Sequence, residues 1–312
     1  MSANSAQKLQ FARVDIQFQI MDNMKILKTS ASAQYKLLDS GDGEKLERYG
    51  KFILSRPDPQ ALWNKTLPIS EWQKADAVFV RNGAKGGWRK NPNVPEKWKI
   101  EFGGFSFFIK PTAFKHTGLF PEQEPNWRWI MNNIKLAGFN RQVSVLNLFG
   151  YTGGATLASL SAGAEVAHVD GSKSAITWAK ENVSLSGLVD KPVRWILDDA
   201  REFVKREIRR GKRYDAIIMD PPAFGHGAKK ELWKIEDDFL VLMKLCEEVL
   251  SDTPIFFLIN GYSAGYSSIA YENNLSLLLE KFGGKIEKGE LTIEESKNGR
   301  LLPAGIFARW AK

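Results

Sequence analysis

The fold of this 312-residue chain is decided by the stretch Val143-Ser-Val-Leu-Asn-Leu-Phe-Gly-Tyr-Thr-Gly-Gly-Ala155. Its first half is an apolar run that predicts a buried strand, and its second half is a glycine-rich turn that leads into a helix. Glycines at 150, 153 and 154 allow the backbone to turn tightly and to approach a ligand closely. Such a turn alone is weak evidence for a nucleotide, so the neighbouring strands have to carry the interpretation.

From residue 126 onward, apolar strand-like runs alternate with helical stretches of a dozen or more residues. We predict strands at residues 143–149, 165–169, 193–197, 214–219, 255–259, 284–293 and 304–310, and helices at residues 126–136, 155–162, 174–186, 200–210, 230–250 and 267–281. This alternation is typical of an α/β fold with a doubly wound parallel sheet. Only residues 294–299 separate the last two strands, so these should form a hairpin that makes one edge strand antiparallel.

The first third of the chain has a different pattern. Residues 1–23 are predicted to be a poorly ordered or accessory tail. After them, short β-type runs are broken by turn formers such as Asp39-Ser-Gly-Asp-Gly43 and Arg56-Pro-Asp-Pro59. We therefore predict an N-terminal tail at residues 1–23, a small β-rich accessory or substrate domain at residues 24–112, and the α/β domain at residues 113–312.

Composition restricts the class of protein. The formal charge of +8 and the pI near 9.3 indicate a polyanionic partner, although basicity alone is a modest signal. Cys246 is the only cysteine, so an intrachain disulfide is excluded, and three scattered histidines add no metal site. No apolar stretch approaches the roughly 18 residues of a membrane span, and no signal peptide is recognisable. We expect a cytoplasmic protein without a metal or a membrane partner.

Two further strand ends carry carboxylates. The second predicted strand ends at Asp170, about twenty residues beyond the first glycine, from where a carboxylate can reach ribose hydroxyls. The third ends in Asp198-Asp199-Ala200, where a carboxylate can accept from an adenine amino group. Asp170 could instead cap the helix after Ser172. One of Asp198 and Asp199 could cap the helix that starts at Ala200, while the other binds the adenine. Together the three strand ends predict an adenosine-containing cofactor.

The fourth predicted strand ends in Asp220-Pro-Pro-Ala-Phe224. The two prolines fix φ and remove two backbone donors, so that nearby carbonyls face outward as acceptors. Asp220 adds an acceptor, and Phe224 offers a ring on which a planar group can stack. These parts suit a nucleobase taken out of its helix, although an ordinary strand-to-loop turn could have the same sequence.

The glycine spacing distinguishes between adenosine cofactors. Gly150-x-x-Gly153-Gly154 differs from the Gly-x-Gly-x-x-Gly pattern of NAD sites, and the lysine of a phosphate-binding loop is missing. The Asp-Pro-Pro turn and the terminal hairpin add to this difference. The pattern therefore favours S-adenosyl-L-methionine over a dinucleotide or ATP.

The chain resembles class I S-adenosylmethionine-dependent methyltransferases in four motifs: Val145-Leu-Asn-Leu-Phe-Gly-Tyr-Thr-Gly-Gly154, Val169-Asp-Gly-Ser172, Asp198-Asp-Ala200 and Met219-Asp-Pro-Pro-Ala-Phe224. It is similar more narrowly to bacterial enzymes that methylate bases of large-subunit (23S) ribosomal RNA, whose lead-in segment resembles Lys115-His-Thr-Gly-Leu-Phe-Pro-Glu-Gln123. The resemblance covers about residues 110–312. It implies a Rossmann-like seven-stranded sheet with the last strand antiparallel, preceded here by the small, mostly β domain.

The resemblance also assigns roles to matching positions. It implies that Asp170 binds the ribose, that Asp199 binds the adenine amino group, and that Gln123 closes over the cofactor. The implied cofactor site consists of Gln123, Phe149, Gly150, Tyr151, Thr152, Gly153, Asp170, Gly171, Asp199 and Ala200. The implied site for the methyl-accepting base consists of Asp220, Pro221, Pro222 and Phe224.

The chain departs from the members of this group that make 5-methylcytosine. Residues 1–110 do not resemble their PUA-type RNA domain, and Leu258-Ile-Asn-Gly-Tyr-Ser263 lacks the cysteine that they carry near the end of the fifth strand. Carbon-5 of cytosine reacts only after a thiolate has added to the ring. Cys246 falls on the apolar stripe of a predicted helix, which indicates an inert core residue. We therefore predict methylation of a nitrogen, either exocyclic or in the ring.

Two cationic stretches are candidates for contact with RNA. One is residues 205–213, and the other combines Arg81, Lys85, Trp88, Arg89 and Lys90. A solvated helix face or a surface hairpin would have the same composition. The leading interpretation is a ribosomal RNA base methyltransferase. The alternatives are a methyltransferase acting on a protein side chain or a small molecule, and a non-catalytic RNA-binding factor that retains the cofactor fold.

Overall fold

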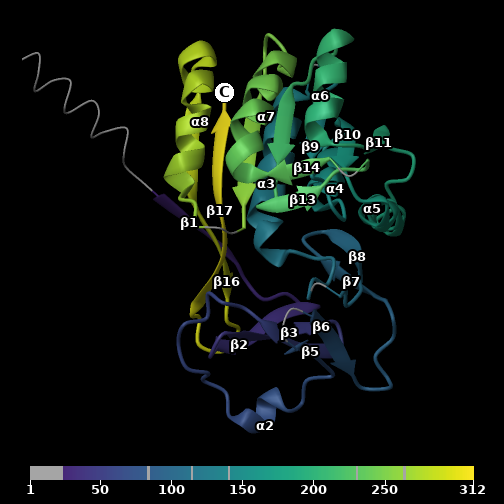
Figure 1. The fold of residues 1–312 in the computed structure, drawn as a ribbon, viewed down its shortest axis with the longest axis vertical. Coiled ribbons are helices and arrows are strands. Elements are labelled where there is room, and N and C mark those ends of the chain that lie inside the picture. Colours follow the sequence, from purple (N-terminus) through teal and green to yellow (C-terminus); the bar gives the residue numbers. More distant parts are fainter. Residues whose placement is uncertain (1–23, 83–84, 114, 140, 230, 263–264) are drawn as a thin grey trace, which may run out of the picture.

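The computed structural model describes residues 24–82, 85–113, 115–139, 141–229, 231–262 and 265–312. The predicted tail at residues 1–23 lies outside the described residues. An α/β part lies above a smaller β-rich part, and a long hairpin of strands runs from the first into the second (Figure 1). In the described part of the chain, no helix has the length and apolar character needed to cross a membrane.

The larger sheet contains eight strands. They are β1 Met24–Thr29, β9 Ser144–Leu148, β10 Glu165–Asp170, β11 Val193–Leu197, β12 Ala216–Met219, β15 Phe256–Gly261, β16 Lys285–Glu294 and β17 Leu301–Ala311. Their order across the sheet is β1-β16-β17-β15-β12-β9-β10-β11, and every neighbouring pair is parallel except the two that include β17. The predicted α/β fold with a mostly parallel sheet is confirmed.

Two details of this sheet differ from our expectation. It has eight strands rather than seven, because β1 pairs in parallel with β16 along its whole length. Residues 24–29 therefore belong to the larger sheet and not to the small β-rich part, to which we had assigned them. The last strand, β17, is antiparallel as predicted, but it lies inside the sheet. The hairpin places β16 outside β17, and β1 then covers that edge.

Helices cover both faces of the larger sheet. On one face pack α3 Glu124–Ala137, α4 Gly154–Ser161 and α5 Lys173–Leu185, and on the other pack α6 Ala200–Arg209, α7 Ile235–Val249 and α8 Ser268–Phe282. Each helix turns an apolar stripe with spacings of three and four residues toward the sheet. α7 begins later than predicted, because the preceding residues form a strand, β14 Leu232–Lys234, which pairs with β13 Phe224–His226.

The small β-rich part contains a five-stranded sheet and a separate hairpin. The sheet has the order β2 Tyr35–Gly41, β3 Glu44–Tyr49, β4 Phe52–Pro57, β5 Ala77–Asn82 and β6 Lys85–Lys90, and the hairpin consists of β7 Trp98–Phe102 and β8 Phe105–Ile109. A short helix, α2 Ile69–Trp72, lies in the connection between the parallel strands β4 and β5. One continuous hydrophobic core joins this part to the first face of the larger sheet, from Tyr35 through Trp127 to Val145.

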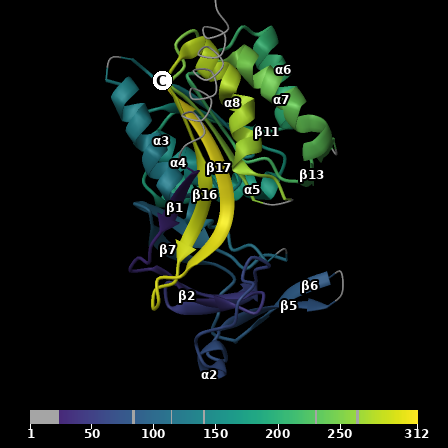
Figure 2. The same ribbon diagram turned by 90° about the vertical axis from the view of Figure 1, so that its left-hand side faces the viewer.

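The hairpin of β16 and β17 reaches the small sheet with its tip (Figure 2). There the backbone N–H of Ser296 donates to the carbonyl of Leu37 at 2.8 Å. The guanidinium of Arg300 donates to the carbonyl of Ser40 at 2.7 Å and to the buried carboxylate of Glu295 at 2.8 Å. The shared hydrophobic core is the first attachment between the two sheets, and these polar contacts at the hairpin tip are a second one.

The contact between β1 and β16 depends on Gly289. A Cβ atom at this position would lie 1.7 Å from the carbonyl oxygen of Lys25, so Gly289→Ala must push β1 away from the sheet. We expect the free energy of unfolding to fall by about 1–3 kcal/mol, and hydrogen exchange at residues 24–29 to become faster.

The matched control is Gly87→Ala in β6, where an added Cβ meets nothing within 4 Å. Thermal melting and hydrogen exchange of both variants check this prediction. Equal melting temperatures and equal exchange at residues 24–29 would show that the β1 contact does not depend on the glycine.

Candidate functional site

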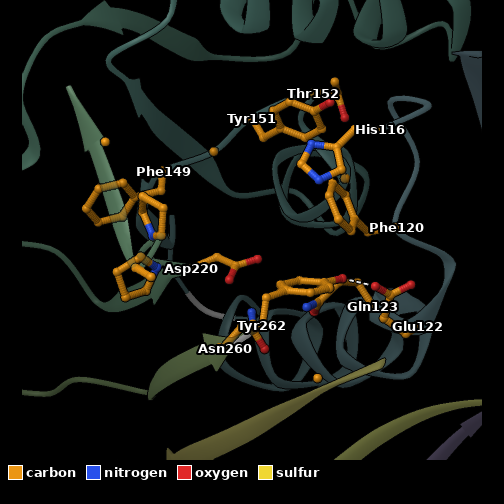
Figure 3. Close-up of a pocket in the computed structure, with 18 of the residues that line it drawn as sticks. His116, Phe120, Glu122, Gln123, Phe149, Tyr151, Thr152, Asp220, Asn260 and Tyr262 are labelled. Atoms are coloured by element: carbon orange, nitrogen blue, oxygen red, sulfur yellow. Dashed lines mark hydrogen bonds between the residues drawn. The ribbon is translucent and has the colours of Figure 1, made fainter. Parts of the chain in front are cut away.

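A cavity of about 1010 Å³ lies at the carboxyl ends of the central strands, between the larger sheet and the small one. It is lined by all of the predicted site residues except Phe224. Figure 3 shows Asp220 and Tyr262 near its centre, Phe149 on one side, and Glu122 and Gln123 on the other. Ligands of open α/β sheets bind at this edge, so the fold places the predicted residues where a ligand would lie.

The glycine-rich turn after β9 has an unusual backbone conformation. Phe149 and Tyr151 adopt φ values of 57° and 46°, which are rare for residues with a side chain, and Gly153 has φ 90°. At Gly150 a Cβ would lie 2.4 Å from the ring of His168, so a side chain does not fit. The turn therefore follows a path that only this spacing of glycines permits.

Asp170 holds this turn in place. Its carboxylate accepts from the backbone N–H of Tyr151 at 2.9 Å and from that of Ser172 at 2.7 Å. Burial raises the pKa of Asp170, while the two backbone N–H groups act in the opposite direction. Its neighbour Gly171 faces the carbonyl of His226, which would lie 3.0 Å from an added Cβ. The carboxylate thus stands inside the cavity, close to the β13–β14 hairpin.

Asp199 is the N-cap of α6, an alternative that the sequence left open. Its carboxylate accepts from the backbone N–H groups of Arg201 and Glu202 at 2.9 and 3.2 Å, and from the Arg201 guanidinium at 2.9 and 3.0 Å. Burial alone would raise the pKa of Asp199, but the hydrogen bonds from Arg201 hold it below its usual value. Asp198 forms an ion pair with Arg206. Both carboxylates line the cavity, next to Ala200.

The Asp-Pro-Pro turn is held by its own carbonyl groups. The carbonyl of Pro222 accepts from the indole N–H of Trp233 at 2.6 Å, and that of Ala223 accepts from the backbone N–H of Ile235 at 3.1 Å. These two carbonyls are therefore engaged, contrary to our expectation that they would face outward. Among the described residues, none donates a hydrogen bond to the carbonyl of Pro221.

Asp220 faces the cavity without a hydrogen-bond partner among the described residues. Its carboxyl group is enclosed by protein except where it borders the cavity, and burial raises its pKa to about 7. Phe224, in contrast, is 59% exposed and packs edge-to-face against His226. The structure therefore brings Asp220, Pro221 and Pro222 together and leaves the ring of Phe224 outside.

An aromatic cluster in the cavity escaped the sequence analysis. The ring of Phe120 lies 4.9 Å from that of Tyr262, 5.5 Å from that of Tyr151 and 5.4 Å from that of His116. The hydroxyl of Tyr262 donates to the buried carboxyl group of Glu122, whose pKa burial raises to about 8. Tyr262 lies in the segment Leu258–Ser263, where related enzymes carry a cysteine, and only this position marks it in the sequence.

Gln123 lines this cavity and carries a buried amide donor. Its Oε1 accepts from Nδ2 of the buried Asn126 at 3.2 Å, and the same Nδ2 donates to Oδ1 of Asn260 at 2.9 Å. Oδ1 of Asn126 accepts in turn from Arg309 at 3.0 Å. The Nε2 atom of Gln123 is buried and has no partner among the described residues. A buried donor without a partner is unfavourable, so this atom indicates a place for an acceptor on a ligand.

Cys246 and the histidines lie apart from one another. Cys246 is fully buried on α7, away from the cavity lining, and burial raises the pKa of its thiol. The prediction of a core cysteine is confirmed. His168 is buried against Thr156, and burial lowers its pKa to about 3. In the ranges that the structure covers, no group of three or more His, Cys, Asp or Glu side chains is arranged to hold a metal ion.

The two predicted RNA-contacting stretches carry internal partners. Trp88 is half-buried, and its indole N–H donates to the carbonyl of Thr112 at 2.7 Å. On α6, Lys205 pairs with Glu202 and Arg210 pairs with Glu207. The side chain of Lys85 lies outside the described part of the structure. These stretches therefore give no direct support for base stacking.

Comparison with known proteins gives these observations a context. Residues 80–275 match the sequence model of the S-adenosylmethionine-dependent methyltransferase family. The chain is 28% identical over 192 residues to the ribosomal RNA large subunit methyltransferase K/L of Syntrophotalea carbinolica, and the match covers 60% of this chain and 26% of that protein. It is 31% identical over 160 residues to a putative ribosomal RNA large subunit methyltransferase of Methanocaldococcus jannaschii, and this match covers 50% of this chain and 40% of that protein. The chain thus spans well under half the length of these two curated relatives.

A solved structure matches almost the whole chain. The S-adenosylmethionine-dependent methyltransferase from Agrobacterium tumefaciens is 42% identical, with a TM-score of 0.87 over 92% of this chain and 93% of that one. The family match alone extends over more than half of the 312 residues. The family match includes the glycine turn, the carboxylates at successive strand ends and the Asp-Pro-Pro turn. This chain belongs to the S-adenosylmethionine-dependent methyltransferase family.

Proposed function

We propose that the protein transfers a methyl group from S-adenosylmethionine to a nitrogen atom of a base in large-subunit ribosomal RNA. One observation carries the proposal: Asp220 lies in the same cavity as the glycine turn and Asp170. Its carboxyl group has no hydrogen-bond partner among the described residues, and burial raises its pKa. The names of the curated relatives support ribosomal RNA as the substrate.

The residues of the cavity fit this cofactor. Once bound, S-adenosylmethionine supplies an electrophilic methyl group on a positively charged sulfur. The unpaired Nε2 of Gln123 can donate to a carboxylate, and the glycine turn leaves room for a ligand beside the backbone. Each oxygen of Asp170 accepts one backbone N–H and retains a lone pair for a ribose hydroxyl. We assign the adenine amino group to the wall formed by Asp198 and Asp199.

The acceptor side of the cavity suits a planar base that bears an amine. Asp220 can accept one hydrogen of an exocyclic amino group, and the carbonyl of Pro221 can accept another. The rings of Phe120 and Tyr262 provide flat apolar walls in place of Phe224. Ionised Asp220 can then take up the proton that the amine loses. A ring nitrogen without a proton would need only positioning.

The position of Cys246 supports nitrogen over carbon as the methyl acceptor. Methylation of carbon-5 of cytosine requires a thiolate next to the base. Cys246 is buried on α7 and does not line the cavity, and its raised pKa disfavours the thiolate. Directly after β15, Tyr262 reaches the cavity, and it carries no nucleophilic sulfur.

The decisive experiment uses large-subunit ribosomal RNA transcribed in vitro and S-adenosylmethionine with a labelled methyl group. We expect label in the RNA and, after digestion, in an N-methylated nucleoside. Label on carbon would contradict the nitrogen assignment, and label only in ribosomal proteins from whole ribosomes would favour a protein substrate. Absence of cofactor binding near micromolar concentrations in calorimetry would favour a non-catalytic RNA-binding factor.

The role of Gln123 can be tested without turnover. Gln123→Leu removes the unpaired Nε2, so we expect the affinity for S-adenosylmethionine to fall about tenfold or more, as for the loss of a hydrogen bond to a charged group. Calorimetric titration measures this. Gln60→Leu, at a cavity-lining position outside the predicted cofactor site, is the control and should bind as the native protein does. Equal affinities for both variants would remove Gln123 from the cofactor site.

The rate should depend on the ionisation of Asp220. Because burial raises its pKa to about 7, the carboxylate form is scarce below that pH, and kcat/KM should rise with pH and level off above about pH 8. Asp220→Asn keeps an acceptor oxygen but cannot take up a proton. We expect it to lower kcat about a hundredfold or more and to abolish the rise. A pH profile that Asp220→Asn leaves unchanged would indicate an acceptor that loses no proton.

Cys246 should be dispensable. We expect Cys246→Ala to retain kcat within about twofold, because its sulfur is away from the cavity lining. Its melting temperature should fall, since a buried side chain is shortened. The measurement is methyl transfer at a temperature well below melting. Complete loss of transfer in a folded C246A protein would contradict the nitrogen mechanism.

A further inference from the structure

The cavity has two walls of opposite charge. On the side of the larger sheet, the carboxylates of Asp170, Asp199 and Asp220 face it. On the side of the small sheet, its lining includes Lys45, Arg56 and Lys115. We refer to these three residues as the cationic wall. An anionic group that enters the cavity is attracted by the cationic wall.

Arg56 is the fixed member of the cationic wall. It is 6% exposed, and its guanidinium donates to both oxygens of the fully buried Glu47 at 2.6 and 3.0 Å and to the hydroxyl of Tyr49 at 2.9 Å. Burial alone would raise the pKa of Glu47, but Arg56 holds it at about 2. A bidentate pair of this kind leaves little freedom to the guanidinium. Arg56 also donates to the carbonyl of Lys115 at 3.4 Å, so it positions that residue.

Lys115 is the member whose charge is uncompensated. It has φ 65°, and its ammonium donates to the carbonyl of Pro57 at 3.2 Å. Within the described residues no carboxylate lies in ion-pair range of it. Lys45, by comparison, is paired with Asp58 at 3.0 Å. Three cations thus face only Glu47 and Asp58, because the raised pKa of Glu122 keeps that residue neutral at pH 7.

The surroundings confirm a positive field on this side. Burial lowers the pKa of Lys115, and Lys45, Arg56 and Arg81 lower it further against the opposing effect of Asp58. The pKa of His116 falls to about 4 through burial and the same cations, Arg56, Lys115 and Lys45. A half-buried cation beside other cations is unfavourable by itself. An anionic ligand would remove this cost.

We propose that the cationic wall binds the backbone phosphate of the nucleotide whose base lies at Asp220. The proposal rests on the proposed function and narrows its substrate to a polynucleotide, because a protein side chain or a neutral small molecule has no group for this wall. Lys115 and Lys45 contact the phosphodiester as point charges, and Arg56 holds Lys115 in place. Asp220 takes the base and the cationic wall takes the phosphate, so the base lies toward the larger sheet and the phosphate toward the small one.

The test compares full-length variants on large-subunit ribosomal RNA transcribed in vitro. Lys115→Asn removes the charge with a residue that tolerates positive φ, and Lys115→Arg retains it. Lys51→Asn removes an exposed cation from the same sheet outside the cavity. Circular dichroism and melting confirm that each variant folds. Filter binding gives RNA affinity at several salt concentrations, calorimetry gives the affinity for S-adenosylmethionine, and label transfer gives kcat and KM.

We expect Lys115→Asn to raise KM for RNA about tenfold, to change kcat less, and to reduce the slope of log affinity against log salt by about 1. The affinity for S-adenosylmethionine should not change, and Lys115→Arg should restore RNA binding. If Lys115→Asn behaves like Lys51→Asn while the native protein methylates RNA, this inference is wrong and the proposed function stands. If the native protein labels only protein, both fail.

Discussion

The arrangement of the site depends on the packing of Trp127 between the small β-rich part and the glycine turn. Trp127 is 4% exposed, stacks on Phe107 with ring centroids 5.5 Å apart, and meets Phe102 edge-on. On its other side a Cβ at Gly154 would lie 2.4 Å from the indole, so the first residue of α4 has to be a glycine. One side chain therefore joins the β7–β8 hairpin, α3 and the glycine turn. The turn that faces the cofactor is packed against the aromatic core of the small β-rich part.

This contact explains why the two sheets act as one unit around the cavity. The hydrophobic core is continuous from the small sheet to the larger one, and the tip of the β16–β17 hairpin adds the polar contacts of Glu295 and Arg300 at a distance from it. Two separate attachments restrict rotation of one part against the other. The acidic and the cationic walls thus face each other in a fixed geometry, which electrostatic selection of a ligand requires.

The local features of the fold could be predicted from the sequence, and the non-local ones could not. The strands and helices of the α/β part follow from apolar periods within ten to twenty residues. β1 is a strand of six residues with an exposed-and-half-buried alternation, and its partner lies more than 250 residues away, so no local pattern identifies it. Glu122 and Tyr262 are 140 residues apart in the sequence, and this separation likewise hides their hydrogen bond.

The site itself shows a different limit of prediction. The residue types at the strand ends were sufficient to place Asp170, Asp199 and Asp220 in one cavity. They could not decide between capping and ligand binding for Asp199, because both roles use the same acceptor at the same position. Nor could they orient Phe224, whose ring direction depends on the pairing of Phe224 with Lys234 across the β13–β14 hairpin.

The raised pKa of Asp220 connects the two halves of the cavity. Burial favours the neutral acid, and a positive charge placed beside the carboxyl group favours the carboxylate. By linkage, a cation binds more tightly where the group beside it is ionised, and it draws that group toward ionisation. With a positively charged methyl donor bound beside it, Asp220 would ionise at a lower pH and could then accept a hydrogen bond from the base. Glu122, which accepts from Tyr262, remains neutral and adds no negative charge to that of Glu47 and Asp58 beside the cationic wall.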